Sequence, residues 1–313
     1  MHIPFQPENW QGRVDSADGE RGLRWHQVVK PSYGQEIQFL GLASDEGVRR
    51  NQGRVGAKDG PTALRKALAN LPKHVLKSIG DMGDVVCEGE TLEEAQALYT
   101  QMAKEQLSPE KLVIGLGGGH EIAFASASAL TQAFPDSKIG FVNLDAHFDL
   151  RDEARASSGT PFLQALRDAP NAEYWVYGIS QAANTQALFD AAERTQSHYR
   201  FDNELTLFHM PVALEELKRW IDSLDHLYLS LDMDVFSASY APGVSAPAAY
   251  GLTPDIVEQL IRVAGQSGKL RIADIAELNP TYDIDNRTAR LAARMIFTMV
   301  DSWANDKKPV EII

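Results

Sequence analysis

The sequence predicts an α/β fold in which helices cover both faces of a parallel sheet. From about residue 37 onward, apolar runs of strand length alternate with segments that have helical spacing. The strand-like runs are predominantly apolar, as expected for strands that are buried on both faces. Neither a linker rich in Pro, Gly or Ser nor an internal repeat divides the 313 residues, so we expect one domain.

Six apolar runs have the length and composition of buried strands. Each is too short to cross a membrane. The predicted strands are residues 37–42, 111–116, 138–145, 174–179, 226–231 and 270–278.

Helical patterns fill the segments between these strands. Pro61 suits the first turn of a helix, and Leu64, Leu68 and Leu71 follow it at helical spacing. Residues 91–94, Thr-Leu-Glu-Glu, match a capping box. The other helices are expected at about 121–134, which Pro135 ends, and at 212–223, 253–264 and 287–304, with Thr253 capping the third of these four. Residues 1–36 are polar and mixed, and we expect an N-terminal extension packed on the domain of residues 37–313.

The charge and the cysteine content exclude several classes of protein. The net charge of -13, without a basic stripe, argues against a nucleic-acid partner. Cys87 is the only cysteine, so no intrachain disulfide can form, and we interpret it as a bystander. Residues 1–5 lack the pattern of a signal peptide, and no membrane span is present. We expect a cytoplasmic protein that acts on a small molecule.

Six candidate metal ligands follow three of the predicted strands. They are His120, Asp145, His147, Asp149, Asp232 and Asp234. In an open parallel sheet, ligands bind beyond the carboxyl ends of the strands, where residues that are distant in sequence can meet. Residues i, i+2 and i+4 of an extended segment also share one face, which is the spacing found here. The sequence therefore predicts that these side chains converge.

Carboxylates with a little imidazole favour Mn²⁺ or a similar ion over a zinc–thiolate site. Two such ions ~3.5–4 Å apart turn a shared water into a strong nucleophile. Without cations the carboxylates would repel one another, which raises their pKa values. An isolated Asp-x-Asp is usually a turn or a cap, but three such runs at strand ends are difficult to explain in that way. The glycines at 117–119 fit neither a dinucleotide fingerprint nor a phosphate loop, because His120 follows them.

These runs resemble the signature segments of the ureohydrolase family, which includes arginase, agmatinase and formimidoylglutamase. The resemblance extends from about Gly41 to Met299 and rests on Gly-Gly-Gly-His at 117–120, Asp-Ala-His-Phe-Asp at 145–149 and Ser-Leu-Asp-Met-Asp at 230–234. It implies a single three-layer α/β/α domain around a mainly parallel sheet of about eight strands. Residues 37–313 would form this catalytic domain, and the chain would be a homo-oligomer.

The same resemblance implies two Mn²⁺ ions per chain. One ion would be held by His120, Asp145, Asp149 and Asp232, and the other by Asp145, His147, Asp232 and Asp234. Asp145 and Asp232 would then bridge the two ions. The identity of the metal in the cell stays open.

Other segments look most similar to the formimidoylglutamase branch, namely residues 45–57, 119–121, 143–151, 157–162 and 242–247. Arginases carry a proton-shuttle histidine in the segment that matches 157–162, and this sequence has none there. Where arginases have a small amide residue, this chain has Arg151, whose guanidinium suits a carboxylate of the substrate. Arg151 could instead pair with the metal-site carboxylates or with Asp152. A second substrate carboxylate could be bound by Arg49, Arg50 or Arg54, and the sequence does not decide between them.

The activity implied by the resemblance is hydrolysis of N-formimidoyl-L-glutamate to L-glutamate and formamide, in histidine degradation, by a hydroxide that bridges two Mn²⁺ ions. Asp149 would relay a proton to the departing amine, and Glu277 would bind the formimidoyl nitrogens. The alternative within the family is an agmatinase-like or guanidinobutyrase-like enzyme that releases urea. A deacetylase-like enzyme with one zinc ion and a non-catalytic metal-dependent scaffold are the alternatives from other classes.

Overall fold

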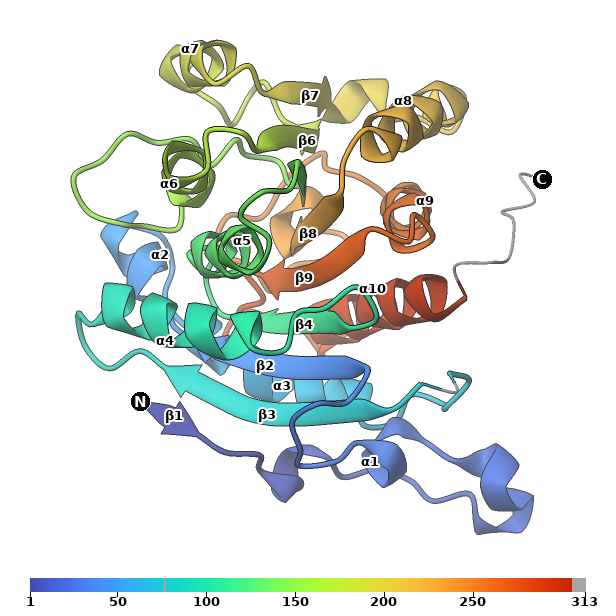
Figure 1. Ribbon diagram of the computed structural model, residues 1–313. Helices are drawn as coiled ribbons and strands as arrows, with labels where there is room; N and C mark the ends of the chain where they lie inside the picture. The colour runs from blue at the N-terminus through green and yellow to red at the C-terminus, as the bar shows by residue number, and fades with distance from the viewer. Residues whose placement is uncertain (76, 306–313) are drawn as a thin grey trace.

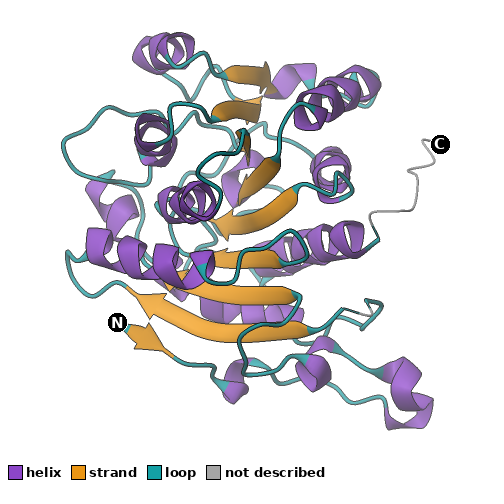
Figure 2. Ribbon diagram, in the orientation of Figure 1, coloured by secondary structure: helices purple, strands orange, loops and turns teal. Residues whose placement is uncertain are grey.

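In the computed structural model, which describes residues 1–75 and 77–305, nine strands form one sheet. Their order is β1-β3-β2-β4-β9-β8-β5-β6-β7, and every neighbouring pair is parallel except β1 with β3 (Figures 1 and 2). The strands are β1 His2–Ile3, β2 Ile37–Ala43, β3 Ile79–Val86, β4 Leu112–Gly117, β5 Ile139–Leu144, β6 Glu173–Ile179, β7 His198–Phe201, β8 His226–Asp232 and β9 Leu270–Ala276. The prediction of a mainly parallel sheet is confirmed.

Helices cover both faces of this sheet. The face of α4 (Leu92–Lys104), α5 (Ile122–Ala133), α6 (Pro161–Asp168) and α7 (Gln186–Arg194) has one apolar core. The face of α3 (Gly60–Leu68), α8 (Met210–Asp222), α9 (Pro254–Gly265) and α10 (Arg287–Ala304) has the other (Figure 1). The short helices α1 (Trp25–Val28) and α2 (Glu46–Arg50) lie at the periphery. The predicted three-layer α/β/α architecture is therefore confirmed.

All six predicted strands are present, and three further strands were not predicted. The missed strand β3 contains Asp81 and Asp84, which disguise it as a loop in the sequence. Arg65 of α3 balances both charges, with Nε 2.7 Å from Asp81 Oδ2 and Nη1 2.6 Å from Asp84 Oδ1. Trp10 Nε1 also donates to Asp81 Oδ2 at 2.7 Å. A single buried arginine thus allows polar residues to occupy an interior strand.

Two details of the predicted helix and strand ends are wrong. Thr91 and Thr253 occupy the N-cap positions of α4 and α9, as predicted, but neither side chain accepts a hydrogen bond from its helix. The Thr91 hydroxyl donates instead to the carbonyl of Glu88 at 2.9 Å, so the capping box does not form. The strand predicted at 270–278 ends at Ala276, because Glu277 adopts a left-handed backbone conformation with φ of 64°.

The N-terminal residues pack against the sheet. Strand β1 forms one edge of the sheet and pairs with β3, with His2 opposite Val85, and Trp10 and Trp25 are buried in the core. A domain division at residue 36 stays a prediction. None of the helices in the described part of the chain has both the length and the apolar character that a membrane span needs.

Candidate metal centre

Four neighbouring strands, β4, β9, β8 and β5, end at the same edge of the sheet. His120 follows β4, Asp232 is the last residue of β8, and Asp145 comes directly after β5. Glu277 comes directly after β9, which lies between β4 and β8. Parallel pairing in this order places all four side chains at one carboxyl edge, where a ligand of an α/β fold is expected.

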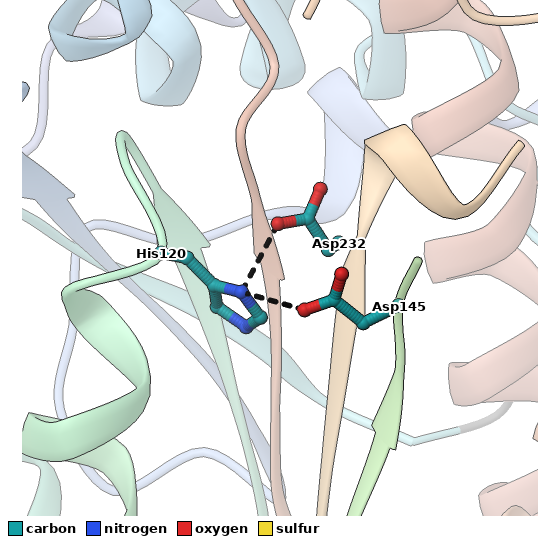
Figure 3. A group of neighbouring side chains, drawn as sticks. All are labelled: His120, Asp145 and Asp232. Atoms are coloured by element: carbon teal, nitrogen blue, oxygen red, sulfur yellow. Dashed lines mark ion pairs between the residues drawn. The ribbon is translucent and has the colours of Figure 1, made fainter. Parts of the chain in front are cut away.

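The first cluster surrounds the imidazole of His120 (Figure 3). Its Nδ1 atom lies 3.2 Å from Asp145 Oδ2 and 3.0 Å from Asp232 Oδ2, the two contacts drawn in the figure. The same atom lies 2.8 Å from Asp149 Oδ2. Nδ1 is buried and makes no hydrogen bond with these oxygens. A ring nitrogen and three carboxylate oxygens that face one point, without hydrogen bonds between them, fit the donor set of a divalent cation.

A second cluster adjoins the first and shares Asp145 with it. His147 Nδ1 lies 3.4 Å from Asp145 Oδ1 and 3.3 Å from Asp234 Oδ2. The other oxygen of Asp234 is buried without a partner. Asp232 is not part of this second cluster, and its Oδ1 accepts the backbone N–H of Asp234 at 2.8 Å. The structure thus brings all six predicted side chains together, while a bridging role of Asp232 stays a prediction.

The tautomer of His120 is fixed by residues that sequence reasoning missed. His120 Nε2 lies 2.9 Å from Ser230 Oγ, which donates to Asp274 Oδ1 at 2.6 Å. Tyr228 donates to the other oxygen of Asp274 at 2.7 Å. Because the Ser230 hydroxyl gives its proton to Asp274, it accepts from Nε2–H, and Nδ1 is left free to bind a metal. Ser230 shares a strand face with Asp232, a spacing that could have identified it, whereas Asp274 requires the β8–β9 register.

The charges of the cluster perturb its titration. Burial and repulsion from Asp145 raise the pKa of Asp149 to about 6. Burial, followed by repulsion from Asp234 and Asp145, raises the pKa of Asp232 well above its usual range. Burial lowers the pKa of His120, but contacts with three surrounding carboxylates outweigh it and hold that pKa well above its usual value. Burial also raises the pKa of Asp234. Burial acts in the same direction on Asp145, but His120 and His147 outweigh it and hold that pKa below its usual range. The rise expected of clustered carboxylates is therefore found at three of the four aspartates.

Glu277 borders this cluster. Its Oε1 accepts the backbone N–H of His120 at 2.8 Å, and its Oε2 is buried without a partner. Burial and then repulsion from Glu121 raise the pKa of Glu277 to about 8. Glu121 is itself buried, and its Oε1 accepts from Ser44 Oγ at 2.7 Å and from the N–H of Gly47 at 2.9 Å. Glu277 thus offers a free acceptor, while Glu121 anchors residues 44–47.

Arg151 is not neutralised by the ion pairs considered from the sequence. Its guanidinium is half-exposed, and its sole ion-pair contact among the described residues is Glu153, at 4.0 Å. Asp152 pairs instead with Arg167 at 2.8 Å. Since no metal-site carboxylate contacts Arg151, its charge is available to an anionic ligand.

Comparisons with known proteins match most of this chain. A sequence profile of the Arginase family matches residues 35–301. The formimidoylglutamase of Ralstonia nicotianae is 44% identical over 97% of this chain and 98% of its own length. That of Chromobacterium violaceum is also 44% identical, over 93% of this chain and 96% of its own.

Solved structures also match the fold. The crystal structure of Trypanosoma cruzi formiminoglutamase with Mn²⁺ has a TM-score of 0.78 and 28% identity, covering 88% of this chain and 94% of that one. Formimidoylglutamase from Bacillus subtilis has a TM-score of 0.83 with 21% identity, covering 96% and 98%.

Proposed function

The chain belongs to the arginase family, and from this premise we propose that it is a formimidoylglutamase that hydrolyses N-formimidoyl-L-glutamate to L-glutamate and formamide. The observation that carries the proposal is the cluster of two imidazoles and four carboxylates, buried except for the partly exposed His147, in a chain that is similar over nearly its whole length to formimidoylglutamases. Water adds to the formimidoyl carbon, and the bond from that carbon to the glutamate nitrogen breaks. The nitrogen takes up a proton.

The donor set fits two Mn²⁺ ions. His120, Asp145, Asp149 and Asp232 would hold one, and Asp145, His147, Asp232 and Asp234 the other; the Nδ1 of His120 and the free oxygen of Asp234 support this assignment. When bound, the ions would activate a water and stabilise negative charge as the tetrahedral carbon forms.

Three residues would act on the substrate. The free Oε2 of Glu277 would accept hydrogen bonds from the formimidoyl nitrogens and hold the carbon over the metal edge. Asp149 would carry a proton to the departing amine, since it lies within the first cluster. Arg151 would bind one carboxylate of the dianionic substrate with its unneutralised guanidinium.

A turnover screen tests this proposal. Formimidoylglutamate, arginine, agmatine and guanidinobutyrate are each incubated with the Mn²⁺-loaded protein, and formamide and urea are measured. Formamide from formimidoylglutamate is expected, and urea release as the main activity would overturn the proposal. Dialysis against a chelator should abolish turnover and Mn²⁺ should restore it. Full activity without metal would refute the assigned ligands.

The Arg151→Ala variant distinguishes a dianionic substrate from a cationic one. Loss of a charge-assisted contact of about 1.5–3 kcal/mol should raise KM about 10-fold or more for a dianion and change it little for a cation such as agmatine. The predicted cytoplasmic location and homo-oligomeric assembly accompany this proposal and rest on the sequence and the resemblance.

A further inference from the structure

Arg49, Arg50 and Arg54 differ in how their charges are compensated by other residues of the chain. Arg49 donates to both oxygens of Glu46 at 2.6 and 2.7 Å. Arg50 is buried and pairs with Glu46 at 2.8 Å and Glu93 at 2.6 Å. Both guanidiniums are thus neutralised within the chain, and neither is left to recognise a second anion.

Arg54 has no such partner. Its Nε donates to the carbonyl of Ser245 at 3.0 Å and its Nη2 to that of Val244 at 2.6 Å. The guanidinium lies 4.0 Å from the ring centre of Tyr282. None of the ion pairs among the described residues involves Arg54, so these contacts orient the group without cancelling its charge. Its Nη1 donates to no described protein atom and can serve a ligand.

Arg54 is tied to the metal edge through its backbone and its neighbours. Asn279, two residues beyond Glu277, donates to the Arg54 carbonyl at 3.0 Å. The side chain of Val48 fills the space between Gly119, next to His120, and Gly53: a Cβ on either glycine would lie 2.5 or 2.8 Å from a Val48 methyl. Arg54 therefore belongs to the rim of the same site.

Residues 51–54 connect this rim position to Arg151. A Cβ at Gly159 would lie 2.7 Å from Arg151 Cδ and 3.3 Å from Asn51 Nδ2, so Asn51 and Arg151 pack on the same glycine. Three residues of extended chain span at most about 10 Å, which places Arg54 within that distance of Asn51, backbone to backbone. Two uncompensated guanidiniums thus flank one rim.

The charge balance of the loaded site calls for such a pair. Four aspartates and two divalent cations cancel formally, so the metals leave no net positive charge for a dianion. We propose that Arg54 binds the second carboxylate of the substrate, and that Arg54 and Arg151 together select the glutamate moiety. This inference rests on the proposed function.

The test uses the Mn²⁺-loaded, full-length protein and its Arg54→Gln variant. KM for formimidoylglutamate should rise about 10- to 30-fold, with kcat nearly unchanged, because one charge-assisted contact at an exposed position is lost. Binding of the product L-glutamate, measured by calorimetry, should weaken by a similar factor. The Arg54→Lys variant keeps the positive charge and should lose less affinity. Arg49→Gln is the matched control, since its charge is already neutralised, and it should leave KM within about 2-fold.

Two substrate analogues separate recognition from a structural effect. N-formimidoyl-L-glutamine lacks the side-chain carboxylate, and N-formimidoyl-L-isoglutamine lacks the α-carboxylate. The Arg54→Gln penalty should vanish with one of the two and persist with the other, with Arg151→Ala showing the opposite pattern. An equal penalty with all three substrates, or none with formimidoylglutamate, overturns the role of Arg54. Absence of wild-type turnover of formimidoylglutamate would instead refute the proposed function.

Discussion

Removing the hydroxyl of Ser230 should weaken binding of the metal ion that His120 holds. Ser230 Oγ has two hydrogen bonds, 2.9 Å to His120 Nε2 and 2.6 Å to Asp274 Oδ1, and all three residues are buried. The Ser230→Ala variant leaves both buried partners short of a hydrogen bond. Loss of such a partner of a metal-binding histidine typically costs 10- to 100-fold in metal affinity, or about 1.4–2.8 kcal/mol.

Calorimetric titration of the metal-free protein with Mn²⁺ measures this loss directly. Ser302→Ala is the control, because Ser302 is also buried and, among the described residues, its hydroxyl donates hydrogen bonds only to the Thr298 and Met299 carbonyls of α10. The control should bind both ions with unchanged affinity, while Ser230→Ala loses affinity for one. Equal affinity of Ser230→Ala and the wild type, with both folded, would refute the role assigned to the Ser230–Asp274 pair.

Three further predictions concern charged groups. Burial and repulsion from Glu121 raise the pKa of Glu277 from 4.5 to about 8, so between these values the folded metal-free protein binds a proton that the unfolded chain has released. The free energy of unfolding should therefore fall as the pH rises from 5 to 8, measured by urea titration in the presence of a chelator. A free energy of unfolding that rises over this range would contradict the shift. Arg65→Leu leaves Asp81 and Asp84 without their cation and should lower the free energy of unfolding by about 3–5 kcal/mol. A loss below about 1 kcal/mol would argue against this role of Arg65. Glu121→Ala should raise KM more than it lowers kcat, because it releases residues 44–47. Glu121→Gln keeps a hydrogen-bond acceptor and should keep most of the activity. Equal losses in both variants would speak against an anchoring role.

The sequence predicted those parts of the fold that apolar composition encodes. The six predicted strands are buried and apolar, and their ends agree closely with the structure, apart from the strand that stops before Glu277. Strand β3 escaped prediction because its aspartates are balanced by Arg65, which is distant in sequence. Strands β1 and β7 have only two and four residues, too few for a periodic pattern.

The site shows the same limit. Spacing at strand ends was enough to identify the six side chains that converge, because parallel topology brings strand ends together. It was not enough to identify Asp274, whose role depends on lying opposite Ser230 in the register. Nor could spacing rank Arg49, Arg50 and Arg54, since their difference lies in the partners that tertiary structure supplies.

Asp149 and Glu277 both adopt left-handed backbone conformations, with φ of 51° and 64°. Such a conformation costs a residue with a side chain roughly 1–2 kcal/mol, and glycine avoids this cost. At each position the backbone strain is accepted in exchange for a carboxylate at the edge of the sheet that carries the candidate site. Laboratory evolution that selects for thermal stability alone would tend to enrich glycine at both positions and yield stable but inactive proteins. Selection for a more stable enzyme therefore has to include turnover as a criterion.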